Sequence, residues 1–560
     1  MARQCSRIVD CACRIVGKHM PTSRYKLGQL PRRPVVDLAR GRLEKAAERF
    51  SREYDFGEMR VLVKLIFTSS LALSLGACAH RDSPFCGQKA DNSKAVRSKS
   101  TLITKIEGDA VHVTDYLGAE RWMQKEIPYE SWRHVADRLS RDVISNTSFP
   151  PRNHGQPSLL KEDGYRKEMT GVLQKPFRFQ FVSGNQVDVL VNGPASFANR
   201  KELIEQARES IYMFAWAFYD DGTGWEFADW LINAKLKRLC EGGDLDIKIV
   251  VDGNVAKEIG YRDVLNYLEK YPSFSKSPIQ IVRLKDKRDP YMGMHRKVMI
   301  VDRQYMVMGG MNVGNIYSHL YPDKGGRWRD TDIYVRGPAI NQAQMTFVDE
   351  WNEQRGRKEL TFLPYDFGAP SGEGLSMIVD HQPLRDDNIH IATVKAFYGA
   401  SQSIDIENAY FILDAVMERA LVDALKRGVR VRILSNSKDS IDEPVMTVPI
   451  LQSLARLKKQ GAEVFTKKVY DGSTTLHSKF LLVDGVFCWI GSYNFHPRSY
   501  RYEREIVFAS FDENLAAQFG KIFAEDIAPE RATKPSLEEL RNVKSSLLNK
   551  EVSSHFFDQL

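Results

Sequence analysis

Residues 476–484 read Leu-His-Ser-Lys-Phe-Leu-Leu-Val-Asp, and residues 491–494 after them read Gly-Ser-Tyr-Asn. The same pattern occurs upstream, where residues 294–302 read Met-His-Arg-Lys-Val-Met-Ile-Val-Asp and residues 309–312 read Gly-Gly-Met-Asn. Each copy holds His-x-Lys, four residues, Asp, six residues, a Gly-Gly or Gly-Ser pair, one residue and Asn. A lone His-x-Lys is background, but two full copies with identical spacing predict a duplicated unit.

The residue types in the pattern suit a phosphate group. Strand alternation places His295 and Lys297 on one face of a strand, and His477 and Lys479 on one face of another. A lysine can hold a non-bridging oxygen while the imidazole reaches phosphorus or the leaving oxygen. One histidine would attack phosphorus and the other would move protons. Two such pairs predict one phosphodiester site that needs no metal.

Further residues of the two copies complete the predicted site. The expected catalytic set also includes Asp302 and Asp484, although each alone is more typical of a turn or a salt bridge. Asn312, Asn494 and Ser492 follow or belong to a glycine-containing turn, where the backbone can approach a ligand closely, and are expected to bind the substrate phosphate.

Each catalytic histidine needs an acid that orients its second ring nitrogen. Two acids lie at the start of apolar strands that follow the motif asparagines. We therefore expect Glu505 and Asp332 to orient the histidines.

The body of the chain reads as two like α/β domains. Apolar strands alternate with amphipathic helices in both halves, which predicts mixed, mostly parallel sheets flanked by helices. The two motif copies imply domains related by a pseudo-twofold axis. The predicted boundaries are a lead-in region at 101–186 packed on the first domain, domains at 187–367 and 375–530 joined by a glycine-rich hinge at 368–374, and a tail at 531–560.

The N-terminal part carries a targeting pattern. Residues 59–78 show a basic start, an apolar run shorter than the roughly 20 residues of a membrane span, and small residues before Cys78. This resembles the signal peptide and lipobox of bacterial lipoproteins, with Cys78 lipidated; the alternatives are a membrane anchor or a buried helix. Residues 1–58 are then a possible upstream extension, 79–100 a linker, and Ala79 favours the outer membrane over the inner one.

Composition limits the partners. The net charge is +8, but residues 1–58 carry a surplus of six positive charges, so the remaining chain is near neutral. A near-neutral body argues against a nucleic-acid binder. The seven cysteines show no spacing typical of a metal site.

The paired motif resembles that of the phospholipase D superfamily over residues 187–525. The resemblance implies one active site between two domains and a phosphohistidine formed without a metal or other cofactor. It further implies that His295 is the nucleophile, His477 the general acid and base, and the lysines and asparagines the phosphate ligands. Finer features are similar to the cardiolipin synthase branch, namely Trp328-Arg-Asp-Thr-Asp332, Tyr410-Phe411, Arg427-Gly-Val-Arg-Val-Arg-Ile433 and Asn494-Phe-His-Pro-Arg-Ser499.

The leading hypothesis is an enzyme that transfers a phosphatidyl group from a phospholipid to an alcohol. Its substrates would be phospholipids, its anchor would place it on the periplasmic side of a bacterial envelope, and one chain would form the active unit. The alternatives are a phospholipase D-type hydrolase that uses water, an endonuclease of the same superfamily, and a catalytically dead binding module.

Overall fold

The computed structural model describes residues 148–541, except for 172, 174–179, 255–261, 272–276, 286–291, 322–325, 370–373, 384–385 and 387. It also describes an antiparallel pair of strands, β1 (Ile103–Glu107) and β2 (Ala110–Val113). The predicted extension, signal peptide, lipidated Cys78 and linker lie outside the described residues. None of the helices in the described part is both long enough and apolar enough to cross a bilayer.

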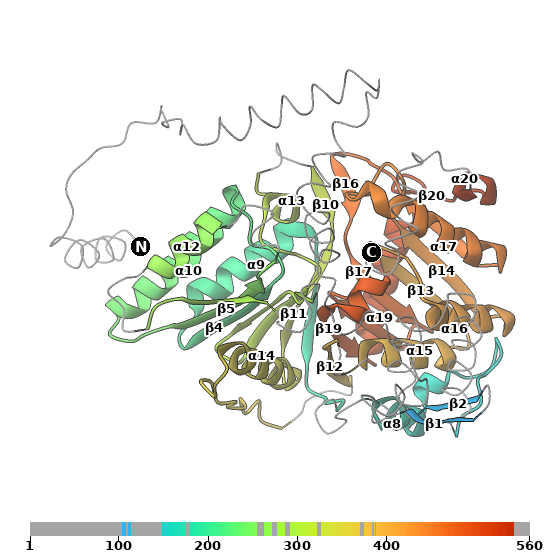
Figure 1. The fold of residues 1–560 in the computed structure, drawn as a ribbon, viewed down its shortest axis with the longest axis horizontal. Helices are drawn as coiled ribbons and strands as arrows, with labels where there is room; N and C mark the ends of the chain where they lie inside the picture. The colour runs from blue at the N-terminus through green and yellow to red at the C-terminus, as the bar shows by residue number, and fades with distance from the viewer. Residues whose placement is uncertain are drawn as a thin grey trace, which may run out of the picture. The chain divides into compact units, whose positions relative to one another are not determined.

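The first half is a seven-stranded sheet in the order β3-β11-β9-β8-β4-β5-β6 (Figure 1). Its strands are β3 (Gln186–Val191), β4 (Ser210–Ala215), β5 (Asp246–Asp252), β6 (Gln280–Leu284), β8 (Val298–Val301), β9 (Tyr305–Gly309) and β11 (Thr331–Arg336). Its helices are α9 (Asn192–Gln206), α10 (Gly222–Cys240), α12 (Arg262–Lys270), α13 (Asn315–Ser318) and α14 (Ala339–Arg355).

The second half repeats this arrangement in the order β12-β19-β18-β17-β13-β14-β15-β20. Its strands are β12 (Ser376–His381), β13 (Ser403–Asn408), β14 (Arg430–Ser435), β15 (Glu463–Lys467), β17 (Lys479–Val483), β18 (Phe487–Gly491), β19 (Glu503–Ser510) and β20 (Ala532–Thr533). Its helical segments are α15 (Asn388–Gly399), α16 (Ala415–Lys426), η2 (Pro444–Met446), α17 (Thr447–Lys459), α18 (Pro497–Arg501), α19 (Glu513–Asp526) and α20 (Leu537–Arg541).

The mixed α/β class is as predicted, but the expectation that most strand pairs are parallel is wrong. Parallel pairing joins β4 to β5 to β6 and β13 to β14 to β15. The motif strands instead form the tight hairpins β8–β9 and β17–β18, and these pair antiparallel with their neighbours. A short turn can only reverse the chain, so each motif hairpin is antiparallel.

Local sequence signals set several helix ends. Asp221 caps α10 by accepting a hydrogen bond from the Gly224 N–H at 2.9 Å, and Asp414 caps α16 by accepting from the N–H groups of Val416 and Met417. Helix α14 ends at Gly356, whose φ of 65° is a left-handed value that glycine adopts without steric cost.

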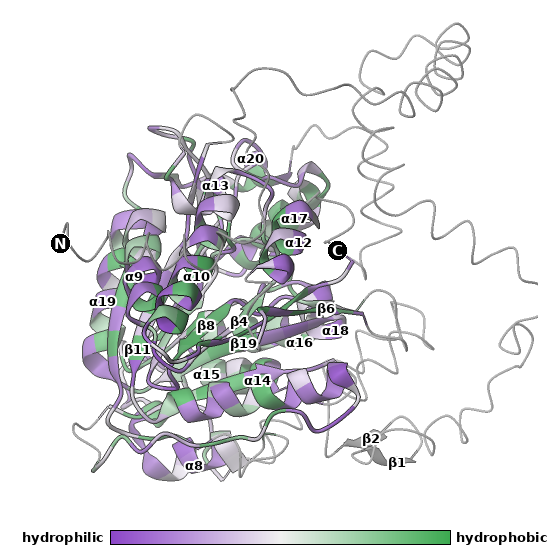
Figure 2. Cartoon of the chain, turned by 90° about the vertical axis from the view of Figure 1, so that its left-hand side faces the viewer, coloured by the Kyte–Doolittle hydropathy of each residue, from purple (hydrophilic) through white to green (hydrophobic). Residues whose placement is uncertain are grey.

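The two sheets share one apolar core. A single cluster of buried side chains contains Phe347 of α14 and Phe214 of β4 from the first half, and Phe480 of β17 and Phe519 of α19 from the second. Figure 2 shows hydrophobic residues along the central strands β4 and β8 and both colours around α14, as a helix with one buried face requires. The two halves are therefore packed together through apolar side chains.

Two short strand pairs also join the halves. Strand β7 (Gly293–Met294) pairs in parallel with β19, and β10 (Arg327–Arg329) pairs in parallel with β16 (Ser473–Leu476). One partner of each pair lies immediately before a motif histidine. The backbone thus brings each motif copy to the edge of the opposite half.

The lead-in region packs on the second half, which corrects the sequence expectation. Its described part includes η1 (Leu159–Lys161) and α8 (Asp163–Gly171). Leu160 and Tyr165 belong to the same buried cluster as the residues of α15, and the Tyr165 hydroxyl donates to the Lys395 carbonyl at 2.7 Å. The apolar side chains of this segment decide its position, and the sequence alone did not reveal which half would receive them.

The start of the predicted tail is also part of the second half. Strand β20 pairs antiparallel with β15, and Leu540 of α20 belongs to the buried cluster that includes α17. The second sheet therefore extends beyond the boundary expected at residue 530.

Candidate active site

The two motif histidines each donate a hydrogen bond to a buried carboxylate. His295 Nδ1 lies 2.9 and 3.0 Å from the two Glu505 oxygens, and His477 Nδ1 lies 2.7 Å from Asp330 Oδ2. Asp330, whose pKa is lowered, is an ionised acceptor, and both Glu505 oxygens accept from serine hydroxyls. In each pair Nδ1 is therefore the donor, and Nε2 is left with a free lone pair. All four side chains are nearly inaccessible to solvent. Each pair is thus a histidine with its nucleophilic nitrogen exposed to the site and its other nitrogen fixed.

Each acid comes from the opposite half of the molecule. The His295 N–H donates to the Arg504 carbonyl at 3.0 Å, which places the next residue, Glu505, beside the ring. In the same way the His477 N–H donates to the Arg329 carbonyl at 2.7 Å and places Asp330 beside its ring. The β7–β19 and β10–β16 strand pairs therefore deliver the acids.

Asp332 does not orient a histidine, which corrects the sequence prediction. Its Oδ2 accepts hydrogen bonds from the Ser196 hydroxyl at 2.5 Å and from the Arg200 guanidinium at 2.9 Å. Both partners lie on α9, within the first half. The acid that sequence reasoning missed is Asp330, two residues earlier. It stands between β10, which pairs with the second half, and β11, which pairs within the first.

The motif aspartates serve the turns, not the chemistry. Asp302 accepts from the backbone N–H groups of Arg208, Glu209 and Ser210 at 2.7 to 2.9 Å. Asp484 accepts in the same way from Ser401, Gln402 and Ser403 at 2.7 to 2.9 Å. Both aspartates have positive φ, 52° and 54°. They fix the start of β4 and β13 at the far end of each motif strand from its histidine, so the expected catalytic role is replaced by a structural one.

The two motif lysines are buried, and each folds back on its own histidine. Lys297 Nζ donates to the His295 carbonyl at 2.6 Å, and Lys479 Nζ donates to the His477 carbonyl. Burial lowers the pKa of Lys297 to about 7 and that of Lys479 to about 8. The site thus holds two cationic groups whose charge is poorly solvated, which favours an incoming anion.

Burial, followed by the charge of the nearby lysines, lowers the pKa of both histidines. The pKa of His295 falls well below its usual value, with Lys297 and Lys479 the next causes after burial. The pKa of His477 falls to about 4, although Asp330 acts in the opposite direction. Both rings are therefore neutral at neutral pH in the empty site.

The two acids differ in their surroundings. Burial and the adjacent Glu503 charge raise the pKa of Glu505 well above its usual value. Burial would also raise the pKa of Asp330, but His477 and Lys479 outweigh it and lower that pKa. The two histidine–acid pairs are alike in geometry and unlike in charge.

Ser492 binds Glu505 and not a position open to substrate. Its hydroxyl donates to Glu505 Oε2, and the Ser499 hydroxyl donates to Oε1 at 2.6 Å. Both serines therefore hold the acid that holds His295. This corrects the expectation that Ser492 binds phosphate, and Ser499 is a further residue that the pattern did not single out for this role.

The motif asparagines are buried, as the motif histidines are. Asn312 Oδ1 accepts from the Ala217 N–H at 3.1 Å, and its Nδ2 donates to the Tyr317 hydroxyl at 3.0 Å, which leaves one amide hydrogen. Asn494 is buried, and its Oδ1 has no hydrogen-bond partner among the described residues. Donors toward a phosphate thus remain available on Asn312.

Aromatic rings lie beside both histidines. Trp216 lies edge-on to His295 with ring centroids 6.0 Å apart, and Tyr317 and Trp328 lie 5.3 and 5.1 Å from the ring of His477. Sequence reasoning did not place the ring of Trp216 in the site, because Trp216 lies in an apolar run that reads as core. The aromatic rings limit access of water to the reacting groups.

One group of ligand-type atoms occurs in the site. The potential ligand atoms of His295, Glu503 and Glu505 all lie within 4.8 Å of one another. In this structure they are engaged in hydrogen bonds or ion pairs, since Glu505 accepts from His295 and Glu503 accepts from Arg498 at 2.8 Å. Their geometry is that of an oriented histidine.

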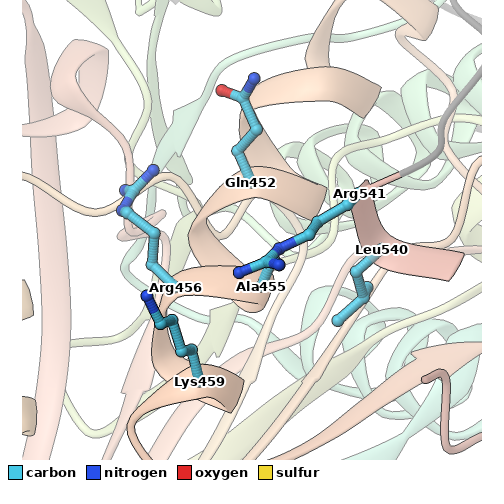
Figure 3. Close-up of a pocket in the computed structure, with 6 residues that line it drawn as sticks. All are labelled: Gln452, Ala455, Arg456, Lys459, Leu540 and Arg541. Atoms are coloured by element: carbon cyan, nitrogen blue, oxygen red, sulfur yellow. The ribbon is translucent and has the colours of Figure 1, made fainter. Parts of the chain in front are cut away.

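A separate cavity of about 440 Å³ lies between α17 and α20 (Figure 3). It contains none of the motif residues, and so it is distinct from the histidine site. Its lining residues are Gln452, Ala455, Arg456, Lys459, Leu540 and Arg541.

Comparisons with known proteins agree with this site. A family model described as the phospholipase D-like domain of cardiolipin synthase matches residues 201–318 and 394–527. Cardiolipin synthase 1 of Staphylococcus epidermidis is 29% identical over 407 residues, which cover 70% of this chain and 77% of that protein. The major cardiolipin synthase ClsA of Bacillus subtilis is 28% identical over 359 residues, covering 63% of this chain and 70% of that protein.

The fold has a solved counterpart in phosphatidylserine synthase of Haemophilus influenzae. The TM-score is 0.57 at 15% sequence identity, with 71% of this chain and all of that chain covered. The fold and the paired motif define a two-domain protein of the phospholipase D superfamily, and this chain belongs to that superfamily. Within it, the chain falls in the cardiolipin synthase-like branch, as the sequence predicted.

Proposed function

We propose that this protein is a phosphatidyltransferase of the phospholipase D type that acts on phospholipid headgroups. The observation that carries the proposal is the pair of histidines, each oriented by an acid from the opposite half, beside two buried lysines. The similarity to cardiolipin synthases supports phospholipids as substrates.

In the first step the two histidines have different roles. His295 Nε2 attacks phosphorus, the bond from phosphorus to the headgroup oxygen breaks, and His477 gives its Nε2 proton to the leaving alkoxide. The lowered pKa of His295 fits its assignment as nucleophile, because the nucleophile must be neutral. The negative phosphate raises the pKa of His477 on binding and so loads the proton that this step uses.

The second step reverses the proton transfer. His477 accepts the proton of an acceptor hydroxyl, the acceptor oxygen attacks phosphorus, and the bond to His295 breaks. Lys297, Lys479 and Asn312 hold the non-bridging oxygens throughout, and Asn494 completes this set in the proposal. A dry site strengthens these interactions, because charge is poorly screened there.

An alcohol is the proposed acceptor. Aromatic rings lie beside both histidines, and both histidines are buried, so we expect limited access of bulk water, which favours a hydroxyl delivered by a bound molecule. The glycerol end of a second phospholipid fits this requirement, and its use would form cardiolipin. One chain supplies both histidines and both acids, and we propose that it is the active unit.

The test is turnover of phosphatidylglycerol vesicles by purified protein, with products followed by mass spectrometry. Wild type is expected to form cardiolipin and free glycerol, and His295→Ala is expected to form neither. Phosphatidic acid as the main product would make water the acceptor. Equal turnover by wild type and His295→Ala would refute the proposal.

We further propose that Cys78 carries a lipid anchor on the periplasmic side of the bacterial envelope. The support is the signal-like stretch at 59–78, together with substrates that reside in membranes. Cys78→Ser is expected to move the protein from the membrane fraction to the soluble fraction, without loss of activity on detergent-dispersed lipid. Membrane recovery unchanged from wild type would contradict the anchor.

A further inference from the structure

Two buried arginines connect the histidine–acid pairs to the packing of the two halves. Arg329 immediately precedes Asp330, and Arg504 immediately precedes Glu505. The backbone carbonyl of each arginine accepts the hydrogen bond from the N–H of the opposite catalytic histidine. The position of each arginine therefore sets the position of its neighbouring acid and of the histidine across from it.

The guanidinium of Arg329 crosses into the second half. Its Nε lies 2.9 and 3.1 Å from the two oxygens of Asp526, the last residue of α19, and its Nη1 donates to the Thr331 hydroxyl at 2.7 Å. The Arg329 and Asp526 side chains are 3% and 4% exposed. Removing one partner alone from a buried ion pair of this kind strongly lowers the stability of the folded protein.

Two carboxylates of the second half lie near the Arg329 guanidinium. Glu407 lies 3.9 Å from Arg329, but burial and then the Asp526 charge raise the Glu407 pKa to about 8. Asp526, at hydrogen-bond distance, is the direct partner of Arg329 across the boundary.

The pseudo-twofold counterpart crosses in the opposite direction. Arg504 of the second half forms an ion pair with Glu350 of α14 in the first half, with Nε and Oε2 3.1 Å apart. Glu350 also accepts from Arg296, the residue between His295 and Lys297, at 3.0 Å. The arrangement occurs twice in one molecule, once beneath each histidine.

We propose that Arg329 and Arg504 are positioning residues, which couple docking of the two halves to the orientation of the histidine–acid pairs. The inference rests on the proposed function, since it assigns the arginines to the reaction of the same site. Neither guanidinium touches the reacting atoms. Each acts through the backbone and the acid beside it.

The molecule offers a matched control. Arg200 and Asp332 form an equally buried ion pair, with side chains 3% and 0% exposed. This pair lies wholly within the first half and contacts neither histidine. Arg200→Lys therefore measures the effect of weakening a buried arginine–carboxylate pair that does not join the two halves. Arg329→Lys keeps the charge but loses the planar fork that reaches Asp526 and Thr331 together.

The experiment compares wild type, Arg329→Lys, Asp526→Asn and Arg200→Lys at a temperature where circular dichroism shows all four folded. One readout is kcat and KM for lipid transfer, and a second is hydrolysis of bis(p-nitrophenyl) phosphate. The third is the NMR signal of the Nδ1 proton that His477 shares with Asp330, assigned by its loss in His477→Ala.

We expect Arg329→Lys and Asp526→Asn to lower kcat about 10- to 100-fold, the scale of a misplacement near 1 Å, with KM changed less than threefold. The His477 proton signal should shift or broaden in both variants. Arg200→Lys should keep the wild-type signal and a kcat within about twofold. Arg504→Lys is compared with wild type in the same way, with the Nδ1 proton signal of His295 as the readout.

Two outcomes would overturn the inference: a kcat for Arg329→Lys within twofold of Arg200→Lys, or an unchanged His477 signal in Arg329→Lys. Failure of the proposed function is distinguishable from this. If wild type turns over no lipid, the lipid assignment fails, while the NMR signal and the bis(p-nitrophenyl) phosphate assay still test the role of Arg329.

Discussion

The low pKa values of the motif lysines predict an unusual pH dependence. Lys297 and Lys479 must be protonated to attract phosphate, yet burial sets their pKa values to about 7 and about 8 in the empty site. We therefore expect kcat/KM to fall as pH rises above 7 to 8. Lys297→Arg should move this alkaline limb upward, even if its maximum is lower, because arginine stays charged. The measurement is a pH profile of kcat/KM from pH 5 to 10.

Stability should respond to pH in the opposite sense. The pKa of Lys297 is lower in the folded protein than in the unfolded chain, so the unfolded chain binds more protons between pH 7 and 10.5. The contribution of this residue to the free energy of unfolding therefore rises with pH in that window. Lys297→Met should stabilise the protein more at pH 6 than at pH 10 in urea unfolding. An equal effect at both pH values would contradict the lowered pKa.

Asp330 immediately precedes β11 and Asp332 lies on it, yet the two aspartates should have separable roles. Asp330→Asn keeps the shape but removes the charge that orients His477, and we expect kcat to fall about 10²- to 10⁴-fold, as for other histidine-orienting acids, with little change in melting temperature. Asp332→Asn leaves Arg200 buried without its partner and should cost about 3 to 5 kcal/mol of stability. Kinetics and thermal unfolding of both variants check this, and a reversed pattern would restore Asp332 as the orienting acid.

The choice between Asp330 and Asp332 could not be predicted from the sequence. Spacing predicted the histidines and lysines, because each belongs to the repeated motif, and Glu505 was predicted from its place at the start of an apolar strand. Asp330 and Asp332 both precede the same apolar strand, and alternation places residues two apart on one face. The choice between them depends on β10 pairing with β16 of the other half, which no local pattern encodes.

At the scale of elements, the motif aspartates predict stability without activity. Asp484 satisfies three backbone N–H groups and occupies a φ of 54°. Asp484→Ala loses these bonds and should lower the free energy of unfolding by about 2 to 4 kcal/mol, while folded protein keeps its kcat. Asp484→Asn retains one acceptor oxygen and should lose less. A tenfold loss of kcat at unchanged stability would return Asp484 to the catalytic set.

The periodicity of the sequence predicted most of the helices and strands. It did not predict where they pack. The alternation of apolar strands and amphipathic helices was predicted in both halves, and the structure has it. The lead-in segment was assigned to the wrong half, because amphipathic residues such as Leu160 and Tyr165 reveal that a face is buried but not against what. The share of parallel strand pairs was likewise overestimated, because the two hairpins that carry the motifs, β8–β9 and β17–β18, are antiparallel.

At the scale of the molecule, the active site depends on the association of the two halves. Each histidine takes its acid from the other half, and two strand pairs, two arginine–carboxylate pairs and one shared apolar core hold the halves together. A half separated from its partner would keep a motif histidine and lose its orienting acid. Duplication within one chain thus keeps both halves present at equal amounts.

The continuity of the chain at the hinge should therefore be dispensable once the protein has folded. A protease site placed in the hinge at 368–374 and cut after folding should leave two fragments that co-elute on gel filtration and retain at least about half of the activity. The lead-in segment strengthens this expectation, because it remains attached to the first half while it packs on the second, with Tyr165 bound to the Lys395 carbonyl. Fragments separated in denaturant should be inactive alone and regain activity on joint refolding. Spontaneous dissociation of the cut protein without denaturant would contradict an interface of this strength.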